Sequence, residues 1–298
     1  MTAEFDRKRG TDVLDKKVLN EWFAIPPDEL EARSPIRLRI LPTREAVHRA
    51  FAETMFNEVR AARDKGDKLA LIVPVGPTGG YPILSEMVNQ ERLPLDHVTF
   101  FGMDNWLDWE GRALPLHDSN NFEGEFHDLF IDRVAPELRP HPAEVIFPTP
   151  TDLDRSAREI ERRGGVATTY GGFGFQGHFA FNEPPSSRWA NVSLDQFRNS
   201  QARILPASVD TIIAHAERHA GGNPFAIPSL AITLGMRDLL GARRIRLYTD
   251  TGSWKQTILR ILLFSEPTVD YPVTLVHGHP DVEVVVDAAS AACPKQCL

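Results

Sequence analysis

The chain has 298 residues, of which 42% are hydrophobic and 25% are charged, and its formal net charge is −8 at pH 7. This length allows one large α/β domain or two smaller ones, with a substantial core. The acidic balance argues against nucleic acid as a partner, although a few local cations could still bind an anionic substrate. No apolar run reaches membrane-spanning length and the N-terminus lacks an apolar secretory segment, so we expect a cytoplasmic protein without a membrane partner.

The two ends of the chain are expected to lie outside the main fold. Residues 1–35 are charged and predict a partly helical N-terminal extension that packs on the outside. Cys293 and Cys297 lie in the C-terminal tail, residues 291–298. Two ligands alone do not make a zinc site and chain ends are usually mobile, so we interpret these cysteines as incidental and expect no metal.

Between these ends, apolar patterns of strand and helix alternate. Thr43 is a plausible N-cap for a helix whose apolar residues recur at helical spacing, and 69–73 is a continuous apolar run typical of a buried parallel strand. Other strands are expected at 36–41, 98–101, 145–147, 166–170, 227–234, 244–248, 273–276 and 282–286, with helices from about 82 and at 120–134, 156–163 and 253–264. The alternation predicts one α/β domain over 36–290, a three-layer architecture with a mostly parallel, Rossmann-like sheet and helices on both faces.

Four chemically suggestive turns each follow a predicted strand. They are Pro77-Thr-Gly-Gly80, the turn at Asp104, Gly171–His178 and Thr249–Lys255. Ligands of open α/β sheets bind at the carboxyl ends of the strands. We therefore expect these four turns to meet at one edge of the sheet.

Two of the turns suit an anion. Thr78-Gly79-Gly80 precedes a helix, where free backbone N–H groups and the helix dipole favour phosphate, although a plain βα turn is about as common. Lys255 starts a helix, a position that the dipole disfavours for a cation. An anionic partner would explain this lysine, and a solvated surface position is the alternative.

The other two turns suit proton transfer. His178 can move protons near neutral pH, and Glu183, held extended before Pro184, could orient it. In isolation such a pair is more often a structural hydrogen bond. Asp104 at a strand end could be a carboxylate base, or it could cap the next turn.

The segment Gly171–Ser187, with the core Gly-His-Phe-Ala-Phe-Asn-Glu-Pro, closely resembles the signature of the glucosamine-6-phosphate deaminase/isomerase family. Pro77–Gly80, Phe101-Gly-Met-Asp104 and Gly252-Ser-Trp-Lys255 match the same family's pattern in the right order. The resemblance extends over about residues 36 to 287, is specific at that core and is loose elsewhere. The related 6-phosphogluconolactonases share the sheet but lack the Phe-Asn-Glu-Pro continuation.

The resemblance implies a role for each turn. It implies that His178, supported by Glu183, opens the sugar ring and that Asp104 moves a proton between sugar carbons. Lys255 would contact the sugar phosphate together with Thr78, Gly79 and Gly80, and Arg203 is a weaker candidate for the same phosphate. No cofactor is implied, and a homo-oligomer is left open.

Three positions depart from the family pattern. Gln176 stands in place of an aspartate that supports the histidine, and glutamine cannot ionise, so we expect a lowered pKa for His178. Asn105 replaces a glutamate and removes a charge. Tyr81 replaces a threonine, so one phosphate-binding hydroxyl is either lost or replaced by the phenol.

The first hypothesis is an isomerase/deaminase of amino sugar metabolism, acting on a phosphorylated amino sugar. The second is a related reaction, either isomerisation of an open sugar phosphate or hydrolysis of a lactone. The third is a sugar-phosphate-binding regulator with impaired catalysis, which Gln176, Asn105 and Tyr81 favour. Trp106 and Trp109 could stack on a sugar or pack in the core. Residues 185–224 read as irregular and could form a lid.

Overall fold

The structure is a computed structural model that describes residues 14–185 and 192–296. Its centre is a seven-stranded parallel sheet in the order β1-β10-β9-β6-β2-β3-β5. These strands are β1 Arg37–Leu41, β2 Leu69–Val73, β3 Val98–Gly102, β5 Val145–Ile146, β6 Thr168–Gly171, β9 Arg244–Thr249 and β10 Val282–Asp287. Strands β2, β3, β6 and β10 are buried along their whole length, which explains the mostly apolar sequences of β2, β3 and β10.

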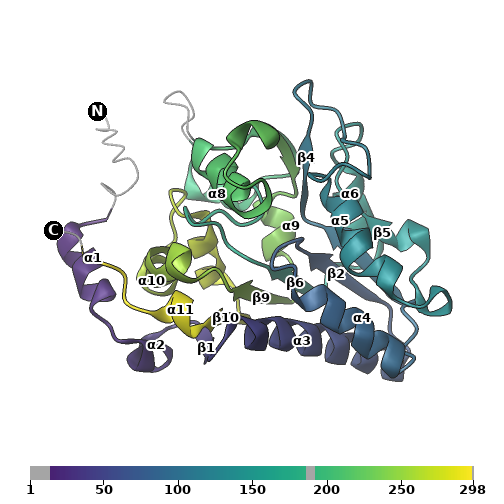
Figure 1. Cartoon of the computed structure of the whole chain (residues 1–298), viewed down its shortest axis with the longest axis horizontal. Helices are drawn as coiled ribbons and strands as arrows, with labels where there is room; N and C mark the ends of the chain where they lie inside the picture. Colours follow the sequence, from purple (N-terminus) through teal and green to yellow (C-terminus); the bar gives the residue numbers. More distant parts are fainter. Residues whose placement is uncertain (1–13, 186–191, 297–298) are drawn as a thin grey trace.

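Helices cover both faces of this sheet, so the predicted three-layer architecture is confirmed. In Figure 1, α3 (Arg44–Lys65) and α4 (Gly80–Gln90) run along the lower side of the sheet, and α9 (Met236–Leu240) and α10 (Gln256–Phe264) lie above it. Each face has its own buried apolar cluster. Thr43 caps α3 as expected, because its hydroxyl accepts a hydrogen bond from the Ala46 N–H at 3.2 Å.

The remaining helices are short. The α-helices are α1 Lys16–Phe23, α2 Pro27–Arg33, α5 Phe122–Leu129, α6 Arg155–Arg162, α7 Leu194–Arg198, α8 Val209–His219 and α11 Ala288–Ala291. The 3-10 turns are η2 Ile131–Arg133, η3 Pro136–Leu138, η4 Pro142–Glu144, η5 Pro224–Ala226, η6 Gly252–Lys255 and η7 Pro272–Gly278. Among the described residues, none of these helices combines the length and the apolar character needed to cross a bilayer.

A second, antiparallel sheet of three strands was not predicted. It has the order β4-β8-β7, formed by Asp104–Leu107, Leu230–Thr233 and Arg203–Pro206. The strand expected at 227–234 therefore belongs to this sheet rather than to the parallel one. The prediction that residues 185–224 are irregular was wrong for the described part, which forms α7, β7, α8 and η5. Strand β7 alternates half-buried and exposed residues, so it carries no apolar run that would mark it.

The strand predicted at 273–276 is also wrong, because these residues lie in the 3-10 helix η7. All four are buried. A short apolar run cannot distinguish a buried strand from a buried helical turn by periodicity alone. Here Pro272 is the first residue of the 3-10 helix. The Thr274 hydroxyl stabilises the first turn by donating a hydrogen bond to the Tyr271 carbonyl at 2.7 Å.

The N-terminal residues that the structure describes are helical, as expected. Leu19, Phe23 and Leu30 are buried in the apolar cluster of the α10 face. The buried guanidinium of Arg260 ties this region to the C-terminal end, donating to the carbonyls of Ile25 and Ala291, each at 3.1 Å. Residues 1–13 and Cys297 lie outside the described residues, and the division into extension, domain and tail stays a prediction.

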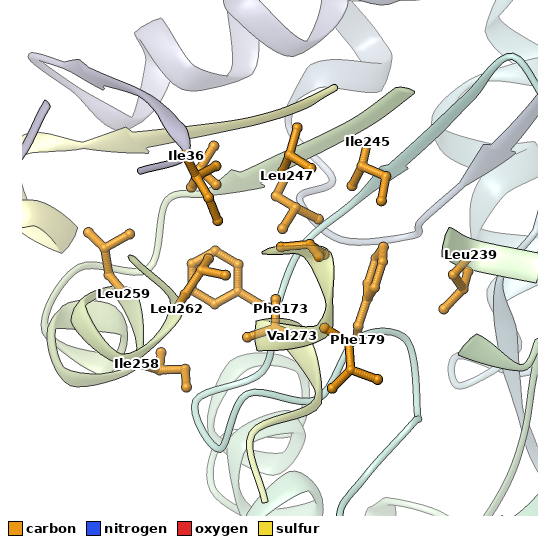
Figure 2. Close-up of a cluster of buried hydrophobic side chains, with 14 of the residues drawn as sticks. Ile36, Phe173, Phe179, Leu239, Ile245, Leu247, Ile258, Leu259, Leu262 and Val273 are labelled. Atoms are coloured by element: carbon orange, nitrogen blue, oxygen red, sulfur yellow. The ribbon is translucent and has the colours of Figure 1, made fainter. Parts of the chain in front are cut away.

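The loop after β6 is anchored by two phenylalanines. Figure 2 shows Phe173 and Phe179 among the buried side chains of β9, α10 and η7, including Leu247 and Leu262. The backbone is tied at the same place, because the Val273 N–H donates to the Gly177 carbonyl at 2.7 Å. His178 therefore lies on a loop that is held at both ends by core contacts.

Candidate active site

A cavity of about 160 Å³ lies where the turns at the carboxyl ends of the parallel strands meet. All four predicted turns contribute to its walls, through Thr78, Asp104, His178 and Lys255. Gly172 marks how closely the loops approach, because a Cβ there would lie 3.3 Å from the carbonyl oxygens of both Gly76 and Tyr248. Glycine permits this close approach.

The glycines of the Pro77–Gly80 turn allow close helix packing. A Cβ on Gly79 would collide with the His48 ring, and one on Gly80 with the Phe51 ring. Both neighbours lie on α3, so the two glycines let α4 begin directly against that helix. Neither lines the cavity, whereas Thr78 does.

The structure does not bring Arg203 to this cavity. Its guanidinium lies 5.6 Å from the centre of the Phe197 ring and donates to the Ser200 hydroxyl at 3.3 Å. Arg218 of α8 lines the cavity instead. The predicted phosphate contact of Arg203 therefore has no support in the geometry, and Arg218 takes its place as the candidate arginine.

Helix α8 contributes cavity residues that were not predicted from the sequence, among them three that can carry a positive charge. His215, Arg218 and His219 lie three and four positions apart, on one side of the helix, and all line the cavity. The signal available was the start of the helix: Ser208 caps it, with Asp210 in the first turn. Two of its apolar residues, Val209 and Ile213, are exposed, so the apolar positions of this helix do not all mark its buried face.

Lys255 and Arg218 form the cationic end of the cavity. The Lys255 side chain is only 4% exposed and its ammonium donates to the Phe173 carbonyl. Burial, followed by the charge of Arg218, lowers the pKa of Lys255 to about 7, although Asp250 acts in the opposite direction. Among the described residues, neither cation has a carboxylate within ion-pair distance. A buried lysine and an exposed arginine, neither of them ion-paired within the described part of the chain, favour binding of an anion here.

His178 packs against Gly174, where a Cβ would collide with the imidazole ring. Its Nδ1 lies 3.4 Å from the Thr211 hydroxyl and 3.9 Å from Glu183 Oε1. The Thr211 hydroxyl also donates to the same Glu183 oxygen. Thr211 therefore bridges the histidine and the glutamate.

Glu183 does not line the cavity but holds the start of α8. Its carboxylate accepts hydrogen bonds from the Ser208 N–H at 2.7 Å and the Ser208 hydroxyl at 3.1 Å. Burial raises the pKa of Glu183, and the hydrogen bonds from Thr211 and Ser208 act against that rise. One carboxylate thus fixes both the imidazole, through Thr211, and the helix that carries Arg218.

The pKa of His178 is lowered to about 3, first by burial and then by the charges of Lys255, His215 and Arg218. The direction agrees with the prediction, but the cause does not involve Gln176. The Gln176 amide donates to an Asp210 carboxylate oxygen and does not line the cavity. At pH 7 the imidazole in the ligand-free cavity is neutral.

Asp104 opens β4 and is paired with Thr233 of β8. Burial raises its pKa to about 8, so the carboxyl group is largely protonated at pH 7. A desolvated carboxyl group of this kind is suited to removing a proton from carbon once it ionises.

The other two departures from the family pattern point away from the cavity. The Asn105 side chain accepts from the Phe122 N–H at 2.8 Å and donates to Asn121 at 3.2 Å, so it anchors α5. The Tyr81 phenol donates to the Pro74 carbonyl in the core and does not replace a phosphate-binding hydroxyl. Of the two tryptophans, Trp106 is buried against Phe181, and Trp109 is 80% exposed.

Comparison with known proteins confirms the resemblance. No family model matches the chain. A glucosamine-6-phosphate deaminase from Caenorhabditis elegans is 29% identical over 230 residues, covering 75% of this chain and 79% of that protein. A glucosamine-6-phosphate deaminase from Exiguobacterium sp. is 28% identical over 216 residues, covering 72% of this chain and 78% of its own length.

Solved structures show the same fold. A monomeric glucosamine-6-phosphate deaminase superposes with a TM-score of 0.74 at 21% identity, over 87% of this chain and 100% of that one. A 6-phosphogluconolactonase from Trypanosoma brucei superposes with a TM-score of 0.60 at 16% identity, over 87% and 98% of the two chains.

Proposed function

We propose that this chain is an enzyme that isomerises and deaminates a phosphorylated amino sugar of the glucosamine 6-phosphate type, releasing ammonia. The observation that carries the proposal is that one cavity holds a buried carboxyl group, a histidine, a buried lysine and an arginine: Asp104, His178, Lys255 and Arg218. The similarity in sequence to glucosamine-6-phosphate deaminases supports this reaction rather than lactone hydrolysis. A cytoplasmic location and a homo-oligomer stay predictions.

The phosphate group binds at the cationic end. Lys255 and Arg218 supply the charge, and the turn at Thr78 supplies a hydroxyl and the start of α4. A phosphate dianion offsets the positive charges that lower the pKa of His178. Substrate binding therefore raises the pKa of His178 and prepares it to act as an acid.

Ring opening uses His178. The imidazole donates a proton to the ring oxygen as the bond from C1 to that oxygen breaks, and the hydroxyl on C1 loses its proton to give the open aldehyde. Thr211 and Glu183 keep the imidazole in place and stabilise its cationic form.

Isomerisation uses Asp104. The ionised carboxylate removes the proton from C2 while the aldehyde oxygen takes a proton from the ammonium, which gives an enolamine. The carboxyl group then returns its proton to C1, which leaves an iminium at C2. Water then hydrolyses the iminium to a ketone and ammonium. Atoms balance with one water consumed, and no electrons leave the sugar.

The direct test is ammonia release from glucosamine 6-phosphate by the purified, folded protein, with ketose phosphate measured in parallel. Loss of 6-phosphogluconolactone is followed in a separate assay. Equal amounts of ammonia and ketose support the proposal. Lactone loss without ammonia, or a folded protein that turns over no hexosamine phosphate, contradicts it.

The regulator hypothesis loses its sequence support in this geometry. It rested on Gln176, Asn105 and Tyr81, and none of these side chains lines the cavity. Each has a structural partner instead, on α8, at the start of α5, or in the β2–α4 turn. These departures therefore do not argue for impaired catalysis.

Replacing Thr211 with valine is expected to reduce kcat about tenfold with little change in KM. Valine keeps the shape but removes the hydroxyl that bridges His178 and Glu183. The basic limb of the kcat–pH profile should move to lower pH, because the imidazolium that acts as the acid loses its support. Thr211→Ser, which retains the hydroxyl, is the control and should behave like the wild type. Equal profiles for all three proteins would show that the bridge has no role.

Replacing Gln176 with aspartate, the residue of the family pattern, is expected to give no gain in turnover. The new carboxylate would face Asp210 across the contact that the amide now makes. Like charges at this distance repel, so we expect a loss of about 1 kcal/mol in the free energy of unfolding, measured in urea. The double change Gln176→Asp with Asp210→Asn should restore it. A large rise in turnover in the single variant would contradict this reading.

A further inference from the structure

Glu125 is a charged residue of the cavity that the proposed chemistry does not use. It lies in the first turn of α5, half-buried, and lines the same cavity as Asp104 and His178. Across the part of the chain that the structure describes, its carboxylate has no hydrogen-bond or ion-pair partner. A partly desolvated carboxylate without a partner is costly unless it serves a ligand.

The position of Glu125 is held firmly. Asn121 caps α5 by accepting the Gly124 N–H at 3.0 Å, and the Asn105 amide donates to the same Asn121 oxygen at 3.2 Å. Gly124 lies so close to the Leu116 carbonyl that a Cβ would collide with it. Because Asn105 adjoins Asp104 in β4, these contacts link Glu125 to the proposed base through rigid elements.

The positive charges of the cavity lie together, with the Asp250 carboxylate beside them, and Glu125 and Asp104 lie apart from them. Lys255, Arg218 and His215 all act on the pKa of His178, so they lie together at one end. The pKa of Glu125 is raised to about 7 by burial and then by Asp128, and that of Asp104 is raised by burial. No cation of the cavity contributes to either shift. The site therefore has a cationic end and a carboxyl end, which suits a ligand with an anion and a cation on one small frame.

We propose that Glu125 binds the amino group of the substrate as an ammonium and so selects amino sugar phosphates over their hydroxy counterparts. The proposal rests on the function proposed above and adds to it a specificity-determining residue. An ammonium beside Glu125 offsets the burial cost and keeps the carboxylate ionised.

The test compares two ligands that differ only at C2, glucosamine 6-phosphate and glucose 6-phosphate. Dissociation constants are measured for both by calorimetry at low temperature, together with initial rates of ammonia release. Glu125→Gln is the test variant. Glu123→Gln is its matched control, since Glu123 is also a half-buried glutamate in the first turn of α5 but does not line the cavity.

We expect the wild type and Glu123→Gln to prefer the amino sugar by about ten- to a hundredfold, the range for a hydrogen bond to a charged group. Glu125→Gln should lose that preference while binding glucose 6-phosphate and inorganic phosphate as before, which shows that the cavity is intact. An unchanged preference in Glu125→Gln, with ammonia still released by the wild type, overturns the role of Glu125 and leaves the proposed function standing. A wild type that binds both sugars equally also overturns it. Absence of ammonia release is scored separately, against the proposed function.

Discussion

The Asp104→Asn variant is expected to lose about a thousandfold in turnover while becoming more stable than the wild type. General base catalysis by a positioned carboxylate typically contributes 10²- to 10⁴-fold, and the amide cannot accept the C2 proton. The stability gain follows from burial. The Asp104 carboxyl is 7% exposed and its pKa is raised to about 8, so ionising it in the folded state is unfavourable.

The sign of the pH dependence follows from the two pKa values of Asp104. In the unfolded chain the carboxyl ionises near pH 4, whereas in the folded protein it stays protonated until about pH 8. The cost to the wild type is absent below pH 4, grows between pH 4 and 8 and is complete above it. At about 1.4 kcal/mol per pKa unit, the gain in Asp104→Asn should reach roughly 3 to 5 kcal/mol at pH 8.

Urea unfolding at pH 4, 6 and 8 measures this gain, and ammonia release measures the loss of turnover. The control is Asp64→Asn, an exposed acid on α3, which should change neither quantity. In the wild type, kcat/KM should rise with pH up to about 7, because only the ionised carboxylate is a base, and above pH 7 the loss of the Lys255 charge should oppose the rise. Turnover by Asp104→Asn within tenfold of the wild type would exclude Asp104 as the base.

The Lys255→Met variant is expected to raise KM for the phosphosugar about a hundredfold and to abolish binding of inorganic phosphate. Methionine keeps the length and burial of the side chain but removes the charge. A charge-assisted contact in a desolvated site contributes about 1.5 to 3 kcal/mol, and the neighbouring Arg218 cannot replace it from α8. Isothermal titration with phosphate and steady-state kinetics measure the two effects.

The free energy of unfolding of Lys255→Met should increase, although the variant binds phosphate more weakly. The pKa of Lys255 is lowered to about 7 in the folded protein, against about 10.4 for an unfolded lysine. The cost of burying the ammonium is therefore complete below pH 7 and disappears as the pH rises toward 10. Lys255→Met should be more stable than the wild type at pH 6 and equal to it near pH 10. Lys65→Met, an exposed position at the end of α3, is the control. An unchanged KM would remove Lys255 from the phosphate site.

The parallel sheet could be predicted from the sequence, and so could the position of the four turns at one edge of it. Both depend on features within a few residues of the chain. Strands such as 69–73 and 98–101 are buried on both faces and so read as continuous apolar runs. Each is followed by a turn with reactive side chains. Since parallel strands end at a common edge, His178, Asp104 and Lys255 could be assigned to one place before any coordinates were known.

The second sheet and helix α8 could not be predicted in this way. Strand β7 has no fully buried residue, and two apolar residues in the first turns of α8, Val209 and Ile213, are exposed, so neither segment carries an apolar run that marks a core element. As a consequence His215, Arg218 and His219 were not predicted as cavity residues, and Arg203 was predicted as the phosphate-binding arginine instead of Arg218. The strand predicted at 273–276 was wrong for a related reason, because a buried apolar run can be either a strand or a helical turn.

The sequence by itself determined which chemical groups stand at the ends of the parallel strands, because hydrophobic runs and turn residues act over a few positions. Only the tertiary structure decided which polar side chains face the cavity. Gln176 is engaged by Asp210, and Asn105 by Asn121, each a partner 34 or 16 positions away. A buried polar group points toward the partner that satisfies its hydrogen bonds, and that partner is known only once the chain has folded.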